Sequence, residues 1–211
     1  PLYDRFSTPG NEMIEHFDAV GAQFDGTSFK RAGELMLAEG YTYDYISDKQ
    51  IANTRFENEE VVSEGGSRYK VIVVPGCKYI PLTTITKLIK LAEQGATIIF
   101  FDGPPSSVSG YYDKESRESA FRNLMARVND QSIKNGVKFG AGRIIVGSDL
   151  SELLARASVY RETLVDMGIQ FLRKKSGNGS GFYFLGNGEK YFEGWVTLQS
   201  KGVGAMLYDP M

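Results

Sequence analysis

Residues 69–103, YKVIVVPGCKYIPLTTITKLIKLAEQGATIIFFDG, decide the fold. Positions 71–74 and 96–101 are almost all apolar, which is typical of strands that are buried on both faces. Between them, Pro81 opens a helix with an apolar stripe, and Gly95 closes that helix. A strand, a crossover helix and a second strand indicate a parallel sheet.

The downstream segments extend this pattern. GRIIVG (142–147) predicts a third buried strand, and Ser148 or Asp149 caps the helix that follows it. Helices that alternate with buried strands predict an α/β fold with a doubly wound, mostly parallel sheet. We expect this body to end near residue 160.

The pattern changes after residue 160. Four short strands separated by SGNGSG, NG and QSKG predict an antiparallel β meander. Near the start of the chain, 12–24 and 29–40 have helical spacing, and 43–47 predicts a short strand. We therefore predict three parts, which are an N-terminal helical segment (1–40), an α/β domain (41–160) and a β-meander extension (161–211) that starts the next domain.

Composition excludes several classes of function. The chain has 211 residues, a formal net charge of -2 and 42% hydrophobic residues, so it is neither disordered nor basic enough to favour nucleic acid. No apolar run approaches the ~20 residues that cross a bilayer, so no membrane partner is expected. The sequence starts PLYDRF without an initiator Met or a signal peptide, and we expect it to be a piece of a larger protein.

Cys77 and His16 are the only cysteine and the only histidine. This count excludes an internal disulfide and a zinc site made of several thiolates and imidazoles. No glycine-rich phosphate motif precedes a helix, so a nucleotide cofactor is not expected. The sequence predicts neither a metal nor a cofactor.

Cys77 follows a buried strand, a position where many hydrolases and amidotransferases hold their nucleophile. A nucleophile elbow has the pattern G-x-[SC]-x-G, whereas Cys77 lies in PGCKY. Its thiol would also need a base, and His16 lies in a helical stretch outside the predicted α/β core. We favour a half-buried structural cysteine and keep a catalytic Cys77 as the alternative.

Open α/β sheets bind ligands at the rim formed by the carboxyl ends of their strands. The candidate binding residues at this rim are Cys77, Asp102, Gly103, Tyr111 and Tyr112. Aspartates at such positions more often anchor loops than bind ligands. Tyr111, Tyr112 and Trp195 are predicted to be partly exposed, which makes a contact with a glycan a further possibility.

Several motifs carry a family resemblance. GYTYDYISDKQI (40–51) and the segment that begins YKVIVVPGCKYIPL (69–82) resemble an accessory segment of large bacterial α-L-rhamnosidase-like glycoside hydrolases. The resemblance resumes at GIQFLRKKSGNGSGFYFLGN (168–187) and ends at VGAMLYDPM (203–211). The family has GYxYDxIS, YxVLVLPxxxxMPL, G(L/I)xFxxR, YFxxN and LxDPMTG at the corresponding places.

The resemblance implies a flavodoxin-like fold similar to the class I glutamine amidotransferases, related to a domain of β-galactosidases. It implies a scaffold, with the sugar-cleaving carboxylates in a barrel domain outside this sequence. The strand that the family has before GYxYD is not evident in 1–40, which leaves the sheet one strand short or rearranges this segment.

We therefore expect a non-catalytic structural or interaction domain of a polysaccharide-degrading glycoside hydrolase. The implied partners are other domains of that hydrolase, a second copy of the chain, or plant or microbial glycans. The family resemblance implies a periplasmic or secreted location. Two alternatives stay open, a stand-alone cysteine hydrolase or amidotransferase that uses Cys77 and a carbohydrate-binding module.

Overall fold

The structure is a computed structural model, and it describes residues 3–4, 24–128, 138–175, 181–187, 192–200, 202 and 204–208. The chain divides into two compact units. Unit 1 comprises Pro1–Gly33 and Tyr45–Val159, and unit 2 comprises Glu34–Asp44 and Tyr160–Met211. Each unit is described by itself.

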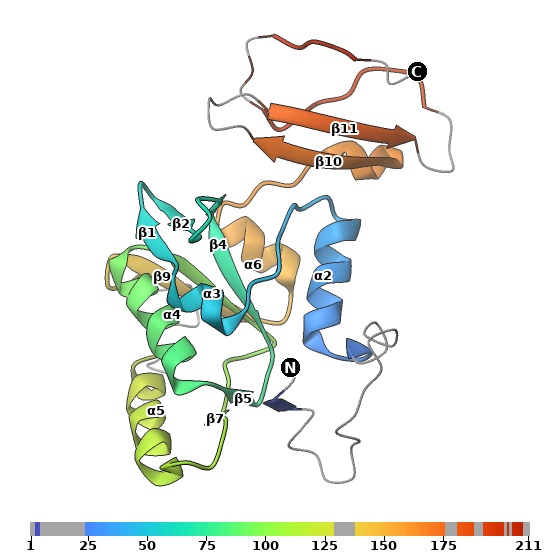
Figure 1. The fold of residues 1–211 in the computed structure, drawn as a ribbon. Coiled ribbons are helices and arrows are strands. Elements are labelled where there is room, and N and C mark those ends of the chain that lie inside the picture. Colours follow the sequence, from blue (N-terminus) through green and yellow to red (C-terminus); the bar gives the residue numbers. More distant parts are fainter. Residues whose placement is uncertain are drawn as a thin grey trace. The chain divides into compact units, whose positions relative to one another are not determined.

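Unit 1 contains a four-stranded mixed sheet with the order β4-β6-β9-β8 (Figure 1). β4 runs parallel to β6 and β6 parallel to β9, whereas β8 is antiparallel to β9. The strands are β4 (Val71–Pro75), β6 (Thr97–Phe101), β8 (Lys138–Phe139) and β9 (Gly142–Gly147). The three strands predicted from the apolar runs are confirmed. β6 is buried along its whole length, whereas only Ile72 of β4 is buried, so the predicted burial of β4 on both faces is wrong.

Helices cover both faces of this sheet. Ile98 and Phe100 of β6 belong to a core cluster with α4 (Leu82–Gln94) and α5 (Lys114–Val128). Ile99 and Phe101 are also fully buried, and strand alternation directs them to the opposite face. The buried leucines of α6 (Leu150–Arg156) lie outside the α4 cluster, and Figure 1 shows α4 and α6 on opposite sides of the sheet.

Local sequence signals explain where the helices begin and end. α4 follows Pro81 and ends at Gly95, whose φ of +131° favours glycine. α6 begins after Asp149, whose side chain accepts a hydrogen bond from the Glu152 amide. Ser47 and Gln50 form a reciprocal capping box at the start of α3 (Asp48–Ala52). The predicted starts of α4 and α6 are confirmed.

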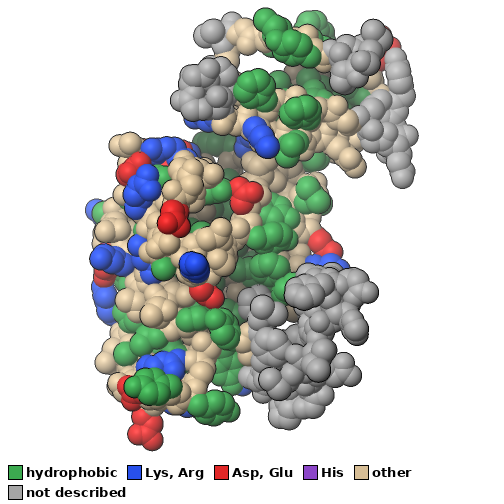
Figure 2. Space-filling model, viewed as in Figure 1, with side chains coloured by type: hydrophobic (Ala, Val, Ile, Leu, Met, Phe, Trp, Pro, Cys, Tyr) green, Lys and Arg blue, Asp and Glu red, His purple; other side chains and the backbone are tan. Residues whose placement is uncertain are grey.

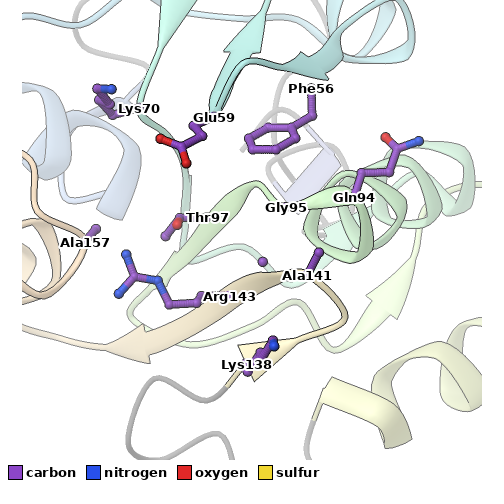
Figure 3. A pocket seen from close by; sticks show the side chains of 11 residues that line it. Phe56, Glu59, Lys70, Gln94, Gly95, Thr97, Lys138, Ala141, Arg143 and Ala157 are labelled. Atoms are coloured by element: carbon purple, nitrogen blue, oxygen red, sulfur yellow. The ribbon is translucent and has the colours of Figure 1, made fainter.

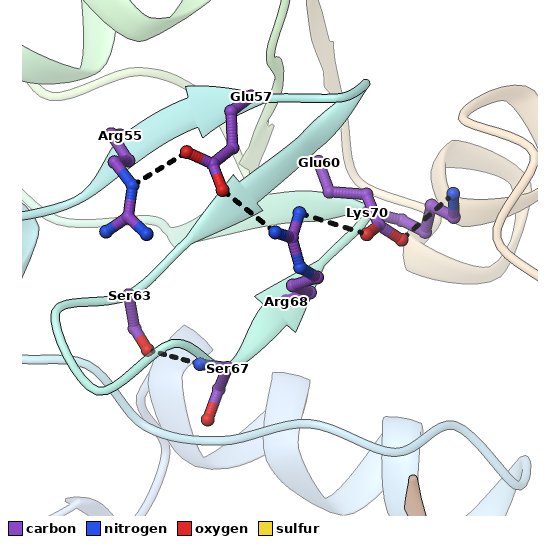
Figure 4. Close-up of polar contacts among 7 residues, drawn as sticks. All are labelled: Arg55, Glu57, Glu60, Ser63, Ser67, Arg68 and Lys70. Carbon is purple, nitrogen blue, oxygen red and sulfur yellow. Dashed lines mark hydrogen bonds and ion pairs between the residues drawn. The ribbon is translucent and has the colours of Figure 1, made fainter. Parts of the chain in front are cut away.

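Two small sheets complete unit 1. β5 (Tyr79–Ile80) and β7 (Ser107–Val108) form a parallel pair. An antiparallel sheet of β1 (Arg55–Glu57), β2 (Glu60–Val62) and β3 (Arg68–Tyr69) was not predicted. Ion pairs cross this sheet, with Arg68 bridging Glu57 at 2.8 Å and Glu60 at 3.8 Å (Figure 4).

Unit 2 contains a 3-10 helix, η4 (Thr163–Met167), and an antiparallel hairpin of β10 (Ile169–Lys175) and β11 (Gly181–Asn187). The first two strands of the predicted meander are therefore confirmed. The described residues of 192–200 and 204–208 form no strand, so for them the meander prediction is wrong. The predicted strand at 43–47 is also wrong, because these residues pair with no strand of the described chain.

The observed class is a mixed α/β fold with a mixed parallel and antiparallel sheet and antiparallel strands near its C-terminus. The strand order shows no reversal, because no described strand pairs with the outer edge of β4. The predicted helix at 29–40 is confirmed as α2 (Ser28–Ala38). The predicted helix at 12–24 and His16 lie outside the described residues. The predicted domain boundaries stay a prediction.

Candidate functional site

The rim at the carboxyl ends of β4 and β6 brings three predicted site residues together. Pro75 and Phe101 pair in register at the ends of the two strands. Cys77 therefore follows the end of β4, and Asp102 and Gly103 follow the end of β6. Gly103 has a φ of +102°, a conformation that favours glycine, so its identity is explained by the backbone.

Asp102 is bound by the chain itself. Its carboxylate accepts a hydrogen bond of 2.6 Å from the Ser28 hydroxyl and forms an ion pair with Arg31. The Arg31 guanidinium also lies 5.0 Å from the centre of the Phe101 ring. Asp102 has a φ of +66°, which is strained for a residue with a side chain. The strain is offset by these internal contacts rather than by a ligand.

The rim also contains a backbone anion-binding feature, and it too is occupied. The amides of Lys78 and Tyr79 point in a common direction after β4, as in the backbone concavities that bind anions. The Asp4 carboxylate accepts both hydrogen bonds, at 2.8 Å from Lys78 and 2.7 Å from Tyr79. The chain thus fills this anion site with its own side chain.

Cys77 is a free thiol that is half-buried. Its pKa is raised to about 11, mainly by burial and also by the carboxylates of Asp4 and Asp48, because each disfavours a thiolate. Lys78 does not offset this, and its ammonium lies 5.0 Å from the centre of the Tyr79 ring. An activated nucleophile needs the opposite shift.

The candidate aromatic residues differ from the rim residues in exposure. Tyr111 and Tyr112 are 91% and 88% exposed in the loop between β7 and α5. Arg117 braces this loop with hydrogen bonds to the main-chain oxygens of Tyr112, at 2.8 Å, and Ser109. In unit 2, Trp195 is 98% exposed. The prediction called these aromatic residues partly exposed, and they are almost fully exposed.

A pocket of about 650 Å³ lies at the opposite, amino-terminal edge of the sheet (Figure 3). Its lining includes the first residues of β6, β8 and β9, which are Thr97, Lys138 and Gly142, and also Arg143. The end of α4 contributes Gln94, and the β1–β2 hairpin contributes Phe56 and Glu59. The volume lies within the range of ~300–1,000 Å³ that is usual for small-molecule sites.

This pocket was missed because its residues carry no motif. Lys138 begins β8 and Arg143 is the second residue of β9, and the sequence gives no sign that their side chains converge. A single local signal exists, since Asn58–Glu59 connects two strands at positions where a hairpin favours Asn-Gly. The partners of Asp102 were also missed, because Ser28 is 74 positions away in the chain.

The described residues contain a third polar cluster, in unit 2. Glu162 is fully buried, and its carboxylate accepts hydrogen bonds from Arg173 at 2.8 Å, Tyr183 at 2.7 Å and the Gln199 amide at 2.9 Å. Burial and the hydrogen bond to Glu162 raise the pKa of Tyr183. Tyr183 is the tyrosine of the YFxxN motif, so this residue of the motif serves the fold of unit 2, whereas Arg173 precedes the arginine position of G(L/I)xFxxR, which is Lys174 in this chain.

The described residues contain no group of three His, Cys, Asp or Glu placed to hold a metal. Among the same residues, no helix is long and apolar enough to cross a membrane. The fold and the site together define a mixed α/β domain with an occupied sheet rim and an antiparallel hairpin unit.

Comparison with known proteins gives the family. Residues 19–198 match the family model of glycoside hydrolases described as alpha-L-rhamnosidase, so the chain belongs to that family. A solved rhamnosidase from Novosphingobium sp. PP1Y is similar in structure, with 28% sequence identity and a TM-score of 0.58. The similarity covers 70% of this chain and 14% of that rhamnosidase. No curated protein matches.

Proposed function

We propose that this chain is a non-catalytic accessory domain of a larger rhamnosidase-like glycoside hydrolase. The observation that carries the proposal is the occupied rim, where Asp102 is paired with Ser28 and Arg31 and Asp4 fills the amides after β4. Catalysis requires groups that interact with the substrate, and these carboxylates are engaged by the chain.

The relation to the class I glutamine amidotransferases is part of this proposal. Three parallel strands with helices on both faces support a flavodoxin-like, doubly wound ancestry. The raised pKa of Cys77 disfavours the alternative of a cysteine hydrolase or amidotransferase, because its thiolate is scarce at neutral pH.

The proposed partners are other domains of the same polypeptide, since the match covers only 14% of the solved rhamnosidase. The outer face of the β10–β11 hairpin supports this. Leu172 pairs with Phe184 and Lys174 with Phe182, so all four share one face, and the apolar three are 52–67% exposed. Figure 2 shows apolar side chains gathered over this hairpin.

Two-stranded hairpins are marginally stable alone, so burial of this face by a neighbouring domain would stabilise it. A periplasmic or secreted location is proposed from the family. A second copy of the chain is the alternative occupant of the hairpin face. Sedimentation separates the two occupants. We expect a monomer. A dimer that is dissociated by Phe184→Asp but retained by Lys175→Asp, on the opposite face of the hairpin, would favour self-association.

An activity assay tests the non-catalytic role. The chain should not hydrolyse 4-nitrophenyl α-L-rhamnopyranoside or L-glutamine above the rate of buffer. Turnover that is lost in Cys77→Ala or Asp102→Asn, while Ser106→Ala retains it, would contradict the proposal.

A further inference from the structure

The backbone of the β1–β2 turn above the pocket is in a left-handed conformation at two residues that are not glycine. Asn58 and Glu59 connect the pair Glu57 and Glu60, and their φ values are +52° and +63°. Two positive φ values define the tight hairpin turn in which Asn-Gly is favoured. Asn adopts this conformation readily, whereas for Glu it is unfavourable. A glycine at position 59 would remove the strain.

The Glu59 carboxylate, at the position where this turn favours glycine, makes no hydrogen bond or ion pair with any residue that the structure describes. The glutamates on either side behave differently. Glu57 binds Arg55 at 2.9 Å, and Glu60 binds Lys70 at 3.3 Å (Figure 4). Cations are therefore available on this sheet, yet Glu59 faces the pocket without one (Figure 3).

Hydrogen-bond donors line the other side of the same pocket. Arg143 donates one hydrogen bond of 3.1 Å to the main-chain oxygen of Arg156, and its guanidinium has further N–H groups. Lys138 makes no hydrogen bond or ion pair with any residue of the described segments. Gln94 adds an amide that both donates and accepts.

Phe56 supplies an aromatic surface to the pocket. Its ring lies against Gly95 so closely that an added Cβ there would approach the ring within 2.3 Å. Gly95 is therefore the residue that allows the ring to occupy this position. A partly buried ring beside acceptors and donors is the combination that binds the apolar and polar faces of a sugar.

Charge selects the kind of sugar. Glu59 offsets one of the two uncommitted cations, Lys138 and Arg143, because Lys70 is paired with Glu60. The carboxyl ends of α4 and α6 reach the lining at Gly95 and Ala157, and helix ends carry a partial negative charge of up to about half a unit each. Because Glu60 is shared between Lys70 and Arg68, the pocket is close to neutral with a small excess of positive charge.

We propose that this pocket is a binding site for a neutral sugar ring of a glycan. The Glu59 carboxylate accepts hydrogen bonds from neighbouring hydroxyls, Lys138 and Arg143 donate to hydroxyl oxygens, and Phe56 packs against the ring. The strain at Glu59 is retained because the carboxylate serves the ligand. This site is independent of the proposed scaffold role, which rests on the opposite rim.

Glu59→Gly tests the proposal, because function and stability should change in opposite directions. In titrations of the ¹⁵N-labelled chain with L-rhamnose, D-galactose and D-galacturonate, wild type should bind a neutral sugar saturably with millimolar affinity. Glu59→Gly should weaken that binding at least tenfold, while its thermal unfolding midpoint rises by about 2 °C. Lys138→Gln should weaken binding without changing the midpoint.

Asn58→Gly is the matched control, since it relaxes the neighbouring position of the same turn and keeps the carboxylate. Its sugar affinity should stay within about twofold of wild type. Absence of saturable binding by wild type, or unchanged affinity in Glu59→Gly, overturns the proposal. Tighter binding of D-galacturonate than of the neutral sugars overturns the assignment of a neutral ligand.

Discussion

The two ends of the sheet in unit 1 each hold a carboxylate on a left-handed backbone, and the chain treats the two differently. Asp102, at the carboxyl end, has a φ of +66°, and Glu59, above the amino end, has a φ of +63°. Asp102 is bound by Ser28 and Arg31, whereas Glu59 has no such partner among the described residues. Similar left-handed backbones therefore hold a carboxylate that makes internal contacts at one end and a carboxylate that lines an open pocket at the other.

The contrast departs from the general behaviour of open α/β sheets, which bind ligands beyond the carboxyl ends of their strands at a reversal of strand order. Here the described strands follow the order β4-β6-β9 without a reversal. Among the described residues no reversal opens a crevice at the carboxyl rim, and the side chains of Asp4 and Asp102 fill its polar positions. The free polar groups are found at the other end.

The largest loss of stability is expected for Glu162, whose carboxylate makes more internal hydrogen bonds than that of Asp102. Glu162→Ala should lower the free energy of unfolding by about 3–5 kcal/mol, because it leaves Arg173 and Tyr183 without their shared acceptor. Urea unfolding measures this. Glu152→Ala, whose carboxylate is exposed, is the control and should lose less than about 1 kcal/mol. Equal losses would contradict the assigned role of Glu162.

The inertness of the carboxyl rim predicts slow alkylation of Cys77. Because its pKa is raised from 9.0 to about 11, the thiolate is about 100-fold scarcer at neutral pH. The higher basicity partly compensates, so iodoacetamide should react roughly tenfold more slowly than with free cysteine. The rate should keep rising between pH 9 and pH 11 and match free cysteine in urea. Faster reaction than free cysteine at pH 7 would show an activated rim.

The same substitution at both strained positions compares the two ends directly. Asp102→Gly relieves the backbone but removes two charge-assisted contacts, so stability should fall by about 1–2 kcal/mol. Glu59→Gly relieves the backbone and removes no internal contact, so stability should rise by about 0.5–1 kcal/mol. If chemical unfolding shows that both substitutions change the free energy of unfolding in the same direction, the proposed difference between the two ends of the sheet is wrong.

The smallest effect is expected in the loop beyond β7. Tyr112→Ser should change the free energy of unfolding by less than about 0.5 kcal/mol, because the ring is 88% exposed. Arg117→Gln should cost about 1–2 kcal/mol, since it removes the hydrogen bonds that brace the loop. A larger loss for the tyrosine than for the arginine would mean that the ring is packed in solution.

Sequence alone predicted the elements whose signals are local. The parallel strands were evident because apolar runs cannot face water, and α4 was bounded by Pro81 and Gly95. The strand predicted at 43–47 is wrong because alternating apolar residues indicate an extended backbone but do not show whether a neighbouring strand is there to pair with it. Tyr45 instead stacks on Phe29, with ring centres 4.9 Å apart.

The candidate sites depend on distant contacts and were predicted only in part. That Cys77 and Asp102 share a rim followed from the parallel register. The ion pair between Arg31 and Asp102 could not be predicted, because the two residues are 71 positions apart in the chain. Glu59 was missed because its significance comes from a backbone angle and a pocket, and neither leaves a composition signal.

The discontinuity of unit 2 has a consequence for biosynthesis. Residues 34–44 belong with residues 160–211, and the Gly40 oxygen accepts the Glu162 amide at 2.9 Å while Thr42 accepts Arg173 at 2.8 Å. On the ribosome the first segment emerges more than 100 residues before its partners, which at ~10 residues per second is a delay of roughly 10 s. A nascent chain arrested at residue 159 would hold the whole sequence of unit 1 while residues 34–44 still lack their partners, and this is the interval in which a chaperone would bind that segment.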